Sequence, residues 1–313
     1  MVAVRISIIC IISMHWYIGI TYMDSDQLKI FLKNHGLKPN FTYGQNFLVD
    51  DFVLQDIVDA AGVTSADAVL EIGPGIGNLT KLLCERALNQ SPQSGSGTGQ
   101  AGFVLSIEKD PKFFPVLRSV KKDYPKNFRF EIADALEYDF QGFFKEQGYK
   151  SYKVVANIPY YITGKILQML LKAEFKPESI TVLTQKEVAQ NIIAPPGSLS
   201  ILAISVQLFG RPKLVQKVLA KSFYPAPKVD SAVLKIDLDK KPKYKLDDEK
   251  RFFKILKACF AGKRKQIHNT LVNNLHLEKN QALEILSQLK IKPAARPQEL
   301  RIEQWVELSK LIS

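Results

Sequence analysis

The chain has 313 residues, which predicts one large domain and one small domain, with ample length for a buried core. Hydrophobic residues make up 46% of it and charged residues 24%, as in an ordinary globular protein. Its 43 Lys and Arg residues against 31 Asp and Glu give a net charge of +12, which favours a polyanionic partner; a basic surface without such a partner is the alternative. The three cysteines have no CxxC spacing, which argues against a disulfide framework or a zinc site and fits a reducing cytosol.

The first 22 residues differ in character from those that follow. Their apolar run Ile6–Ile12 is too short for a transmembrane helix, and no clear small-residue cleavage site follows it. Met23-Asp24-Ser25-Asp26 has the character of a chain start, with a helix cap ahead of Leu28–Leu32. We expect translation to begin at Met23, and mass spectrometry of the native N-terminus tests this expectation.

The stretch YGQNFLVD, residues 43–50, precedes an amphipathic segment. Gln45 and Asn46, beside the apolar Leu48, are placed to close over a ligand on a sheet. A capped helix entry, with an aspartate at the end of the stretch as the cap, is the alternative.

The loop Glu71–Gly77, EIGPGIG, follows an apolar run and precedes a helical pattern that begins at Asn78, which predicts a buried strand, a tight turn and a helix. Gly73, Gly75 and Gly77 give G-x-G-x-G and not the G-x-G-x-x-G of dinucleotide-binding folds, so a pyrophosphate cradle is disfavoured. A strand, Glu-x-Gly-x-Gly-x-Gly and a helix are typical of class I S-adenosylmethionine methyltransferases. An ordinary glycine-rich turn is the alternative.

Two further strands are predicted to end near acidic residues. A low-complexity segment, Gln90–Gly102, is expected to be a mobile surface loop. The strand Phe103–Glu108 that follows it ends in Glu108, and a carboxylate in this place can accept hydrogen bonds from two ribose hydroxyls. Asp134 follows the strand Phe128–Ile132 and can accept from an adenine amino group, although a turn aspartate would look the same.

The stretch VVANIPYY, residues 154–161, has the Asn-x-Pro-aromatic form typical of enzymes that methylate exocyclic amino groups. The amino nitrogen of adenine is a poor nucleophile because its lone pair is delocalised into the ring. Acceptance of its hydrogens by the Asn157 side-chain oxygen and the Ile158 carbonyl would favour a more tetrahedral nitrogen. Pro159 fixes the turn, and Tyr160 offers a flat face on which an extruded base can stack. A strand-to-loop turn with a buried tyrosine is the alternative.

Strands and helices alternate as far as a final pair of strands at Leu214–Leu219 and Ser231–Ile236. This pattern predicts an α/β domain over residues 23–239, with a doubly wound, Rossmann-like mixed sheet whose last strand is antiparallel. Ligands bind at the carboxyl ends of the strands in such sheets. Four predicted loops meet at this edge, those of Gly73, Glu108, Asp134 and Asn157.

Residues 240–313 are predicted to form a small all-α domain. Its residues 242–313 hold 15 Lys and Arg against 8 Asp and Glu, so +7 of the net +12 lies there. We expect RNA contacts from Lys263, Arg264 and Lys265, and from Phe223 and Lys228 in the preceding domain. A solvated helix face is the alternative.

Taken together, these motifs resemble the small-subunit ribosomal RNA adenine N6,N6-dimethyltransferases of the KsgA type. The motifs are GQNFL (44–48), EIGPGIG (71–77), NIPY (157–160), QKEV (185–188), FYPAPKVDSAV (223–233) and KRKQIHN (263–269). The resemblance implies dimethylation of two adjacent adenines in a hairpin near the 3′ end of small-subunit rRNA, late in subunit assembly, with S-adenosylmethionine as the cofactor. It also implies a cytoplasmic monomer without a metal or a membrane contact. It places the cofactor against Asn46, Leu48, Gly73, Glu108, Asp134 and Asn157, to which we add Gln45 and Gly75.

Three features depart from the family pattern. Tyr161 stands where the family usually has a polar residue, which puts the target-base pocket in question. The segment Pro195–Ser205 is shortened and lacks a Tyr-Gly-Arg-Leu-Ser stretch, which puts RNA contacts there in question. The segment Gln90–Gly102 is an insertion.

We expect in-line displacement at the sulfonium methyl without a strong general base, since the amine proton becomes acidic only after the methyl has moved. A large-subunit rRNA adenine methyltransferase of the macrolide-resistance type is one alternative. A non-catalytic ribosome-assembly factor is another, and a metal-dependent or NAD-dependent enzyme is disfavoured by the glycine spacing and the scattered His and Cys residues.

Overall fold

The computed structural model describes residues 23–88, 101–262 and 264–312. The expectations for residues 1–22, for most of the Gly/Ser segment and for Lys263 lie outside the described residues.

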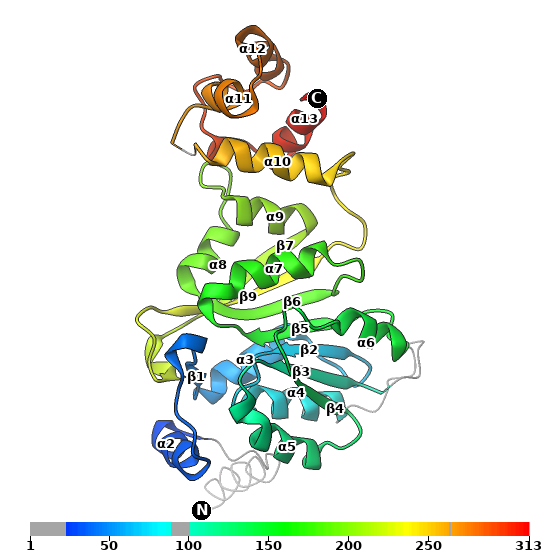
Figure 1. Ribbon diagram of the computed structural model, residues 1–313, viewed down its shortest axis with the longest axis vertical. Helices are drawn as coiled ribbons and strands as arrows, with labels where there is room; N and C mark the ends of the chain where they lie inside the picture. Colours follow the sequence, from blue (N-terminus) through cyan, green and yellow to red (C-terminus); the bar gives the residue numbers. More distant parts are fainter. Residues whose placement is uncertain (1–22, 89–100, 263, 313) are drawn as a thin grey trace, which may run out of the picture.

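A seven-stranded mixed sheet forms the centre of the larger part of the molecule (Figure 1). In spatial order its strands are β4 (Phe128–Ile132), β3 (Phe103–Glu108), β2 (Ala68–Ile72), β5 (Lys153–Asn157), β6 (Ser179–Gln185), β9 (Ser231–Leu238) and β7 (Gly210–Val218). The first five are parallel, and β9 is antiparallel to both of its neighbours. The chain moves outward from β2 to β4 and then returns to β5 on the other side of β2, so the strand order reverses there. This arrangement confirms the expected α/β sheet with an antiparallel last strand, and the reversal point is where such sheets bind ligands.

Helices cover both faces of the sheet because its central strands are apolar on both sides. Leu70 and Ile72 pack into one hydrophobic cluster and Val69 into the other, as the alternation of side chains along a strand requires. The first cluster contains α6 (Phe140–Glu146), α7 (Thr163–Lys172) and α8 (Lys186–Ile192). The second contains α3 (Asp51–Ala61), α4 (Asn78–Leu88) and Val120 of α5 (Phe114–Asp123).

The N-terminal segment packs beside the carboxyl edge of the sheet. It comprises α2 (Ser25–Asn34), the short helix η1 (Phe41–Tyr43) and β1 (Phe47–Leu48), which pairs with β8 (Phe223–Tyr224). Asp24 caps α2 in a reciprocal capping box with Gln27.

Helices α10 (Glu249–Phe260), α11 (Ile267–Leu275), α12 (Lys279–Gln288) and α13 (Ile302–Leu311) gather at one end of the long axis of the molecule (Figure 1). Their core surrounds the buried Trp305 and also takes in side chains of α9 (Ile201–Phe209). The backbone amides of Gly197 and Leu199 donate to the carbonyl of Gln298 in η5 (Pro297–Glu299). The stretch just before α9, which belongs to the segment expected to be shortened, therefore contacts the helical part. The domain boundary at residues 239/240 stays a prediction.

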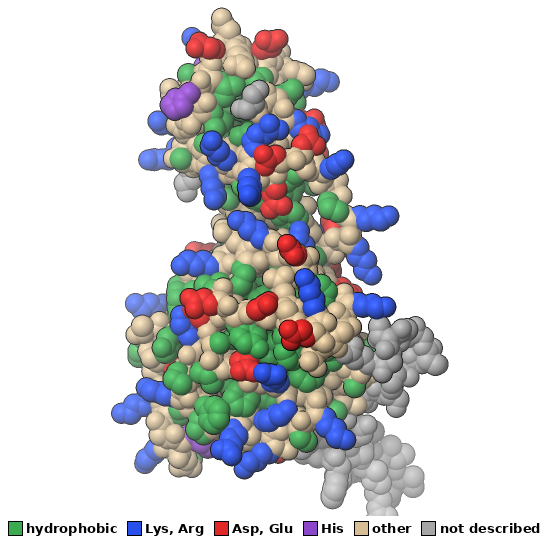
Figure 2. All heavy atoms as spheres, turned by 45° about the vertical axis from the view of Figure 1, so that its right-hand side comes forward, with side chains coloured by type: hydrophobic (Ala, Val, Ile, Leu, Met, Phe, Trp, Pro, Cys, Tyr) green, Lys and Arg blue, Asp and Glu red, His purple; other side chains and the backbone are tan. Residues whose placement is uncertain are grey.

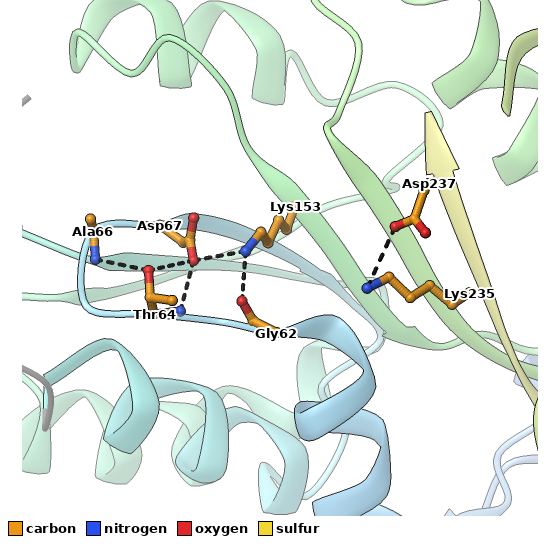
Figure 3. Close-up of polar contacts among 7 residues, drawn as sticks. All are labelled: Gly62, Thr64, Ala66, Asp67, Lys153, Lys235 and Asp237. Carbon is orange, nitrogen blue, oxygen red and sulfur yellow. Dashed lines mark hydrogen bonds and ion pairs between the residues drawn. The ribbon is translucent and has the colours of Figure 1, made fainter. Parts of the chain in front are cut away.

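A lysine at the amino edge of the sheet connects β5 to the end of α3 (Figure 3). Nζ of Lys153 lies 2.6 Å from the carbonyl oxygen of Gly62, which caps α3, and 2.9 Å from Oδ2 of Asp67. Asp67 also accepts from the amide and the hydroxyl of Thr64. This contact fixes the loop that leads into β2, at the edge opposite the candidate site.

Candidate functional site

A hollow opens at the carboxyl edge of the sheet, with about 1120 Å³ of empty space when the open solvent at its mouth is included. The loops after β2, β3, β4 and β5 line it, together with residues 43–48 of the N-terminal segment. The hollow thus brings together the four loops that the sequence pattern placed at this edge, including Gly73, Glu108, Asp134 and Asn157.

The glycine loop lies close to its neighbours in a backbone conformation that glycine adopts most readily. Gly73, Gly75 and Gly77 have φ angles of 75°, 53° and 83°, in the left-handed region. A Cβ atom on Gly75 would lie 3.2 Å from Cε1 of Phe47, and one on Gly73 would lie 3.4 Å from the carbonyl oxygen of Asn157. A side chain at either position would enter the hollow or strain the loop, so the glycines keep this wall open to a ligand.

Glu108 lines the hollow and holds the glycine loop in place. Its Oε2 accepts from the amide of Gly75 at 3.0 Å, and its Oε1 accepts from the amide of Asp110 at 2.8 Å. Burial raises the pKa of Glu108, while these backbone hydrogen bonds act in the opposite direction. A carboxylate oxygen has more than one acceptor direction, so these contacts leave Glu108 able to accept from a ribose.

Asp134 forms an ion pair with Lys109, a residue that the sequence interpretation missed. Oδ2 of Asp134 lies 2.6 Å from Nζ of Lys109, and Oδ1 accepts from the amide of Leu136 at 3.0 Å. The hydrogen bond from Lys109 is the main reason why the pKa of Asp134 is lowered. Lys109 stands 25 positions before Asp134, and only the parallel pairing of β3 with β4 brings them together.

The three N-terminal candidates, Gln45, Asn46 and Leu48, all line the hollow but have different contacts. Nε2 of Gln45 donates to Asp110, and its Oε1 accepts from the amide of Asn40, so both ends of this amide have protein partners. Leu48 is buried in β1. The backbone carbonyl of Asn46 accepts a hydrogen bond from Nδ2 of Asn157.

The Asn157–Tyr160 motif lines the hollow and holds two acceptor atoms that have no donor among the described residues. Nδ2 of Asn157 donates to the carbonyl of Asn46 at 3.4 Å, which turns the side-chain oxygen of Asn157 away from that contact. Among the described residues, no donor reaches this oxygen or the carbonyl of Ile158, and both residues line the hollow. The hydroxyl of Tyr160 lies 2.6 Å from Oγ of Ser231, which fixes the half-buried ring.

Glu71, the acidic residue of the glycine motif, lies outside the hollow and is buried. Its Oε2 accepts from Thr80 at 2.7 Å and from Ser106 at 2.5 Å, whereas Oε1 has no partner within the described chain. Burial raises the pKa of Glu71 to about 7. The glycine motif contains Glu71, but the motif does not predict its role. The fold shows that the Glu71 side chain links β2 to β3 and α4.

The candidate RNA contacts are divided between the two parts of the molecule. Arg264 and Lys265 are exposed between α10 and α11, and Lys228 is exposed in the loop after β8. Figure 2 shows Lys and Arg side chains around the helical part at the top of the view and over the lower part. Phe223 requires a correction: it is 3% exposed because pairing of β8 with β1 turns it into the core, so its side chain offers RNA no surface.

The described ranges hold no cluster of three or more His, Cys, Asp or Glu residues that could bind a metal ion. In the same parts of the chain, no helix combines the length and apolar character needed to cross a membrane.

The chain is similar to known proteins over most of its length. A family model described as "Ribosomal RNA adenine dimethylase" matches residues 36–313. The Ribosomal RNA small subunit methyltransferase A of Dehalococcoides mccartyi strain CBDB1 is 38% identical over 282 residues, which are 90% of this chain and 91% of the relative. The protein of the same name from Clostridium botulinum strain Loch Maree is 38% identical over 289 residues, 91% of this chain and 98% of the relative.

Two solved structures share the fold over most of the chain. A dimethyladenosine transferase from Plasmodium falciparum has a TM-score of 0.67 at 27% identity, covering 84% of this chain and 95% of that one. The 23S rRNA methyltransferase ErmE has a TM-score of 0.65 at 27% identity, covering 85% of this chain and 99% of that one.

Proposed function

This chain belongs to the ribosomal RNA adenine dimethylase family, and we propose that it dimethylates N6 of two adjacent adenines in the 3′-terminal hairpin of small-subunit rRNA during ribosome assembly. Relatives at 38% identity carry a small-subunit name, which favours this substrate over the large subunit. The similar TM-scores to a dimethyladenosine transferase and to a 23S rRNA methyltransferase do not separate the two substrates. The single observation that carries the proposal is the pair of free acceptors at Asn157 and Ile158 inside the hollow.

The hollow fits S-adenosylmethionine, the cofactor of class I methyltransferases. Gly73 and Gly75 leave one wall without side chains, and a Cβ atom there would reduce the space. In this proposal Glu108 holds a ribose and Asp134 an adenine amino group, and Asn46 and Leu48 contact the cofactor from the N-terminal segment; all four residues line the hollow. When bound, the cofactor supplies a methyl group that is already activated as a sulfonium.

The protein's own task is to hold and orient the adenine amino group. The oxygen of Asn157 and the carbonyl of Ile158 accept its two hydrogens, which directs the nitrogen lone pair out of the ring plane. Pro159 fixes the turn between these acceptors and Tyr160, whose ring is held by Ser231 for stacking on the base. Neither Glu108 nor Asp134 has to act as a base, since the amine proton becomes acidic only after the methyl has moved.

The helical part, residues 240–313, provides the RNA and ribosome contacts in this proposal. Lys263, Arg264 and Lys265 contact phosphates there, and Lys228 does so at the sheet domain of residues 23–239. The protein acts as a monomer on the immature small subunit in the cytoplasm.

The test is incubation of the purified protein with S-adenosylmethionine and small subunits that lack these methyl groups, followed by mass spectrometry of the rRNA. Dimethyladenosine at two adjacent adenines near the 3′ end is expected. Methylation of large subunits alone would point to the macrolide-resistance type of enzyme. Binding to small subunits without methylation would point to an assembly factor.

Asn157→Ala is expected to remove most turnover while largely sparing RNA binding, because it deletes an acceptor that acts on the reacting nitrogen. Turnover and subunit binding are measured on the same preparations. Near wild-type turnover of this variant would contradict the role of Asn157.

A further inference from the structure

Tyr161 is an exposed aromatic residue at the mouth of the hollow. It lines the hollow, and 62% of it is exposed. Its hydroxyl has no hydrogen-bond partner within the part of the chain that the structure describes. Tyr160, the residue before it, is half-buried, and its hydroxyl is bonded to Ser231 of β9.

The two tyrosines point in different directions because they share a short 3₁₀ helix, η3 (Tyr160–Ile162). Such a helix has three residues per turn, so neighbouring side chains diverge by about 120°. Tyr160 therefore points toward β9, whereas Tyr161 points toward the N-terminal segment. Asn157 and Ile158 line the same hollow as Tyr161 and are both less exposed than Tyr161, so the ring of Tyr161 lies on the more open side of the motif.

The ring of Tyr161 packs against the backbone of Gly44. A Cβ atom on Gly44 would lie 3.3 Å from Cε1 of Tyr161 and 3.3 Å from Cβ of Pro159. Gly44 has a φ angle of 62° and accepts from Nδ2 of Asn46 at 3.2 Å, which holds this support in place. The backbone thus supports the ring while most of it stays open to solvent.

A lysine lines the same hollow as Tyr161. This residue, Lys109, forms the ion pair with Asp134 described above. Tyr43 also lines the hollow. The hollow therefore combines an open aromatic face with an ion-paired lysine, and the aromatic face suits stacking on a base.

We propose that Tyr161 is a specificity-determining residue that stacks on the nucleotide next to the target adenine. This inference rests on the proposed function, because it assumes a nucleic acid strand at the hollow. The difference in depth separates the two tyrosines: Tyr160 lies inside and receives the target base, whereas Tyr161 lies at the mouth and meets the next base of the strand. Tyr161 thus favours sites in which the neighbouring nucleotide is also unpaired.

Two matched variants test the role of the ring. Tyr161→Phe keeps the aromatic face, and Tyr161→Leu removes it while keeping an apolar side chain. The first measurement is fluorescence anisotropy of a labelled single-stranded oligoadenylate with the full-length protein, which does not depend on catalysis. The Leu variant is expected to bind about tenfold more weakly than wild type, and the Phe variant is expected to keep wild-type affinity.

The second measurement is the steady-state kinetics of methylation on small subunits. For the Leu variant we expect a higher KM with kcat unchanged, because a neighbouring base contributes equally to ground-state and transition-state binding. Unchanged affinity for S-adenosylmethionine and an unchanged melting temperature separate this effect from misfolding.

The following outcomes would overturn the proposal: equal oligonucleotide affinity of the Leu and Phe variants, no binding by the wild type, or a fall in kcat without a change in KM. A wild-type protein that binds the oligonucleotide through the ring but methylates no small subunit would instead contradict the proposed function. The two failures are therefore distinguishable.

Discussion

At the scale of single residues, the buried Glu71 lowers the free energy of unfolding by an amount that depends on pH. Its pKa is raised from 4.5 to about 7 in the folded protein, mainly by burial, and one of its oxygens has no partner among the described residues. Below pH 4.5 the carboxyl is protonated in both the folded and the unfolded state, so the raised pKa does not change the free energy of unfolding. As the pH rises from 4.5 to about 7, the unfolded state loses its proton first and the folded state becomes less stable. Above that range the loss of stability is complete.

Glu71→Gln keeps the shape and the acceptor for Thr80 and Ser106 but removes the charge. We expect the variant to be about 1–3 kcal/mol more stable than wild type at pH 8 and nearly equal to it at pH 4.5. Urea denaturation at both pH values measures the difference, with Glu284→Gln as an exposed control. A stability gap that is the same at both pH values would show that Glu71 is not the titrating group.

Lys109 acts through Asp134, the predicted adenine contact. Removing the ammonium with Lys109→Met leaves the Asp134 carboxylate with the Leu136 amide as its one hydrogen-bond donor in the described parts of the chain, so the carboxylate is less well placed. We expect the dissociation constant for S-adenosylmethionine to rise about two- to fivefold, measured by isothermal titration calorimetry. The exposed Lys112 provides the matched control, Lys112→Met. Equal affinities of the two variants would exclude a positioning role for Lys109.

At the scale of elements, the two ion pairs in Figure 3 differ in burial. Lys153 and Asp67 have side chains that are 13% and 19% exposed, whereas Lys235 and Asp237 are 25% and 49% exposed and lie 3.5 Å apart. Lys153→Met should lower the free energy of unfolding by about 1–3 kcal/mol, because the Asp67 carboxylate then keeps its donors from Thr64 but loses its positive partner, and the carbonyl of Gly62 at the end of α3 loses the lysine donor. Lys235→Met should change it by less than about 1 kcal/mol.

Chemical denaturation of both variants tests this prediction, and methylation at a permissive temperature serves as the control. Activity should survive Lys153→Met because Lys153 begins β5, and the candidate site lies at the other end of that strand. An equal loss of stability in the two variants would mean that burial does not distinguish the pairs.

The order of elements was predictable because it depends on local patterns. The apolar runs, the glycine loop, Glu108 at the end of β3 and Asp134 after β4 mark strand ends, and the fold places them as expected. The contacts that join loops were not predictable, because they cross long stretches of sequence. Gln45 meets Asp110 at a separation of 65 residues, and Phe223 is buried because its short strand pairs with β1. A local pattern contains no information about either partner.

At the scale of the whole molecule, the hollow and the basic residues near α11 lie in different parts. The hollow lies at the sheet edge of the larger part, and Arg264 and Lys265 lie in the helical part at one end of the long axis (Figure 1). Two separated contacts allow the helical part to add affinity without touching the reacting base. Affinity and chemistry should therefore be separable by mutation.

The double variant Arg264→Gln/Lys265→Gln tests this separation. We expect weaker binding to small subunits and a salt dependence of log Kd that is shallower by about 2, since two phosphate contacts are lost. The value of kcat should stay unchanged, because neither residue lines the hollow. Arg118→Gln/Lys122→Gln on α5 removes the same charge from exposed positions of the sheet domain, and it should leave the salt dependence unaltered. A similar change in salt dependence for both double variants would mean that overall charge, and not the position of Arg264 and Lys265, determines subunit binding.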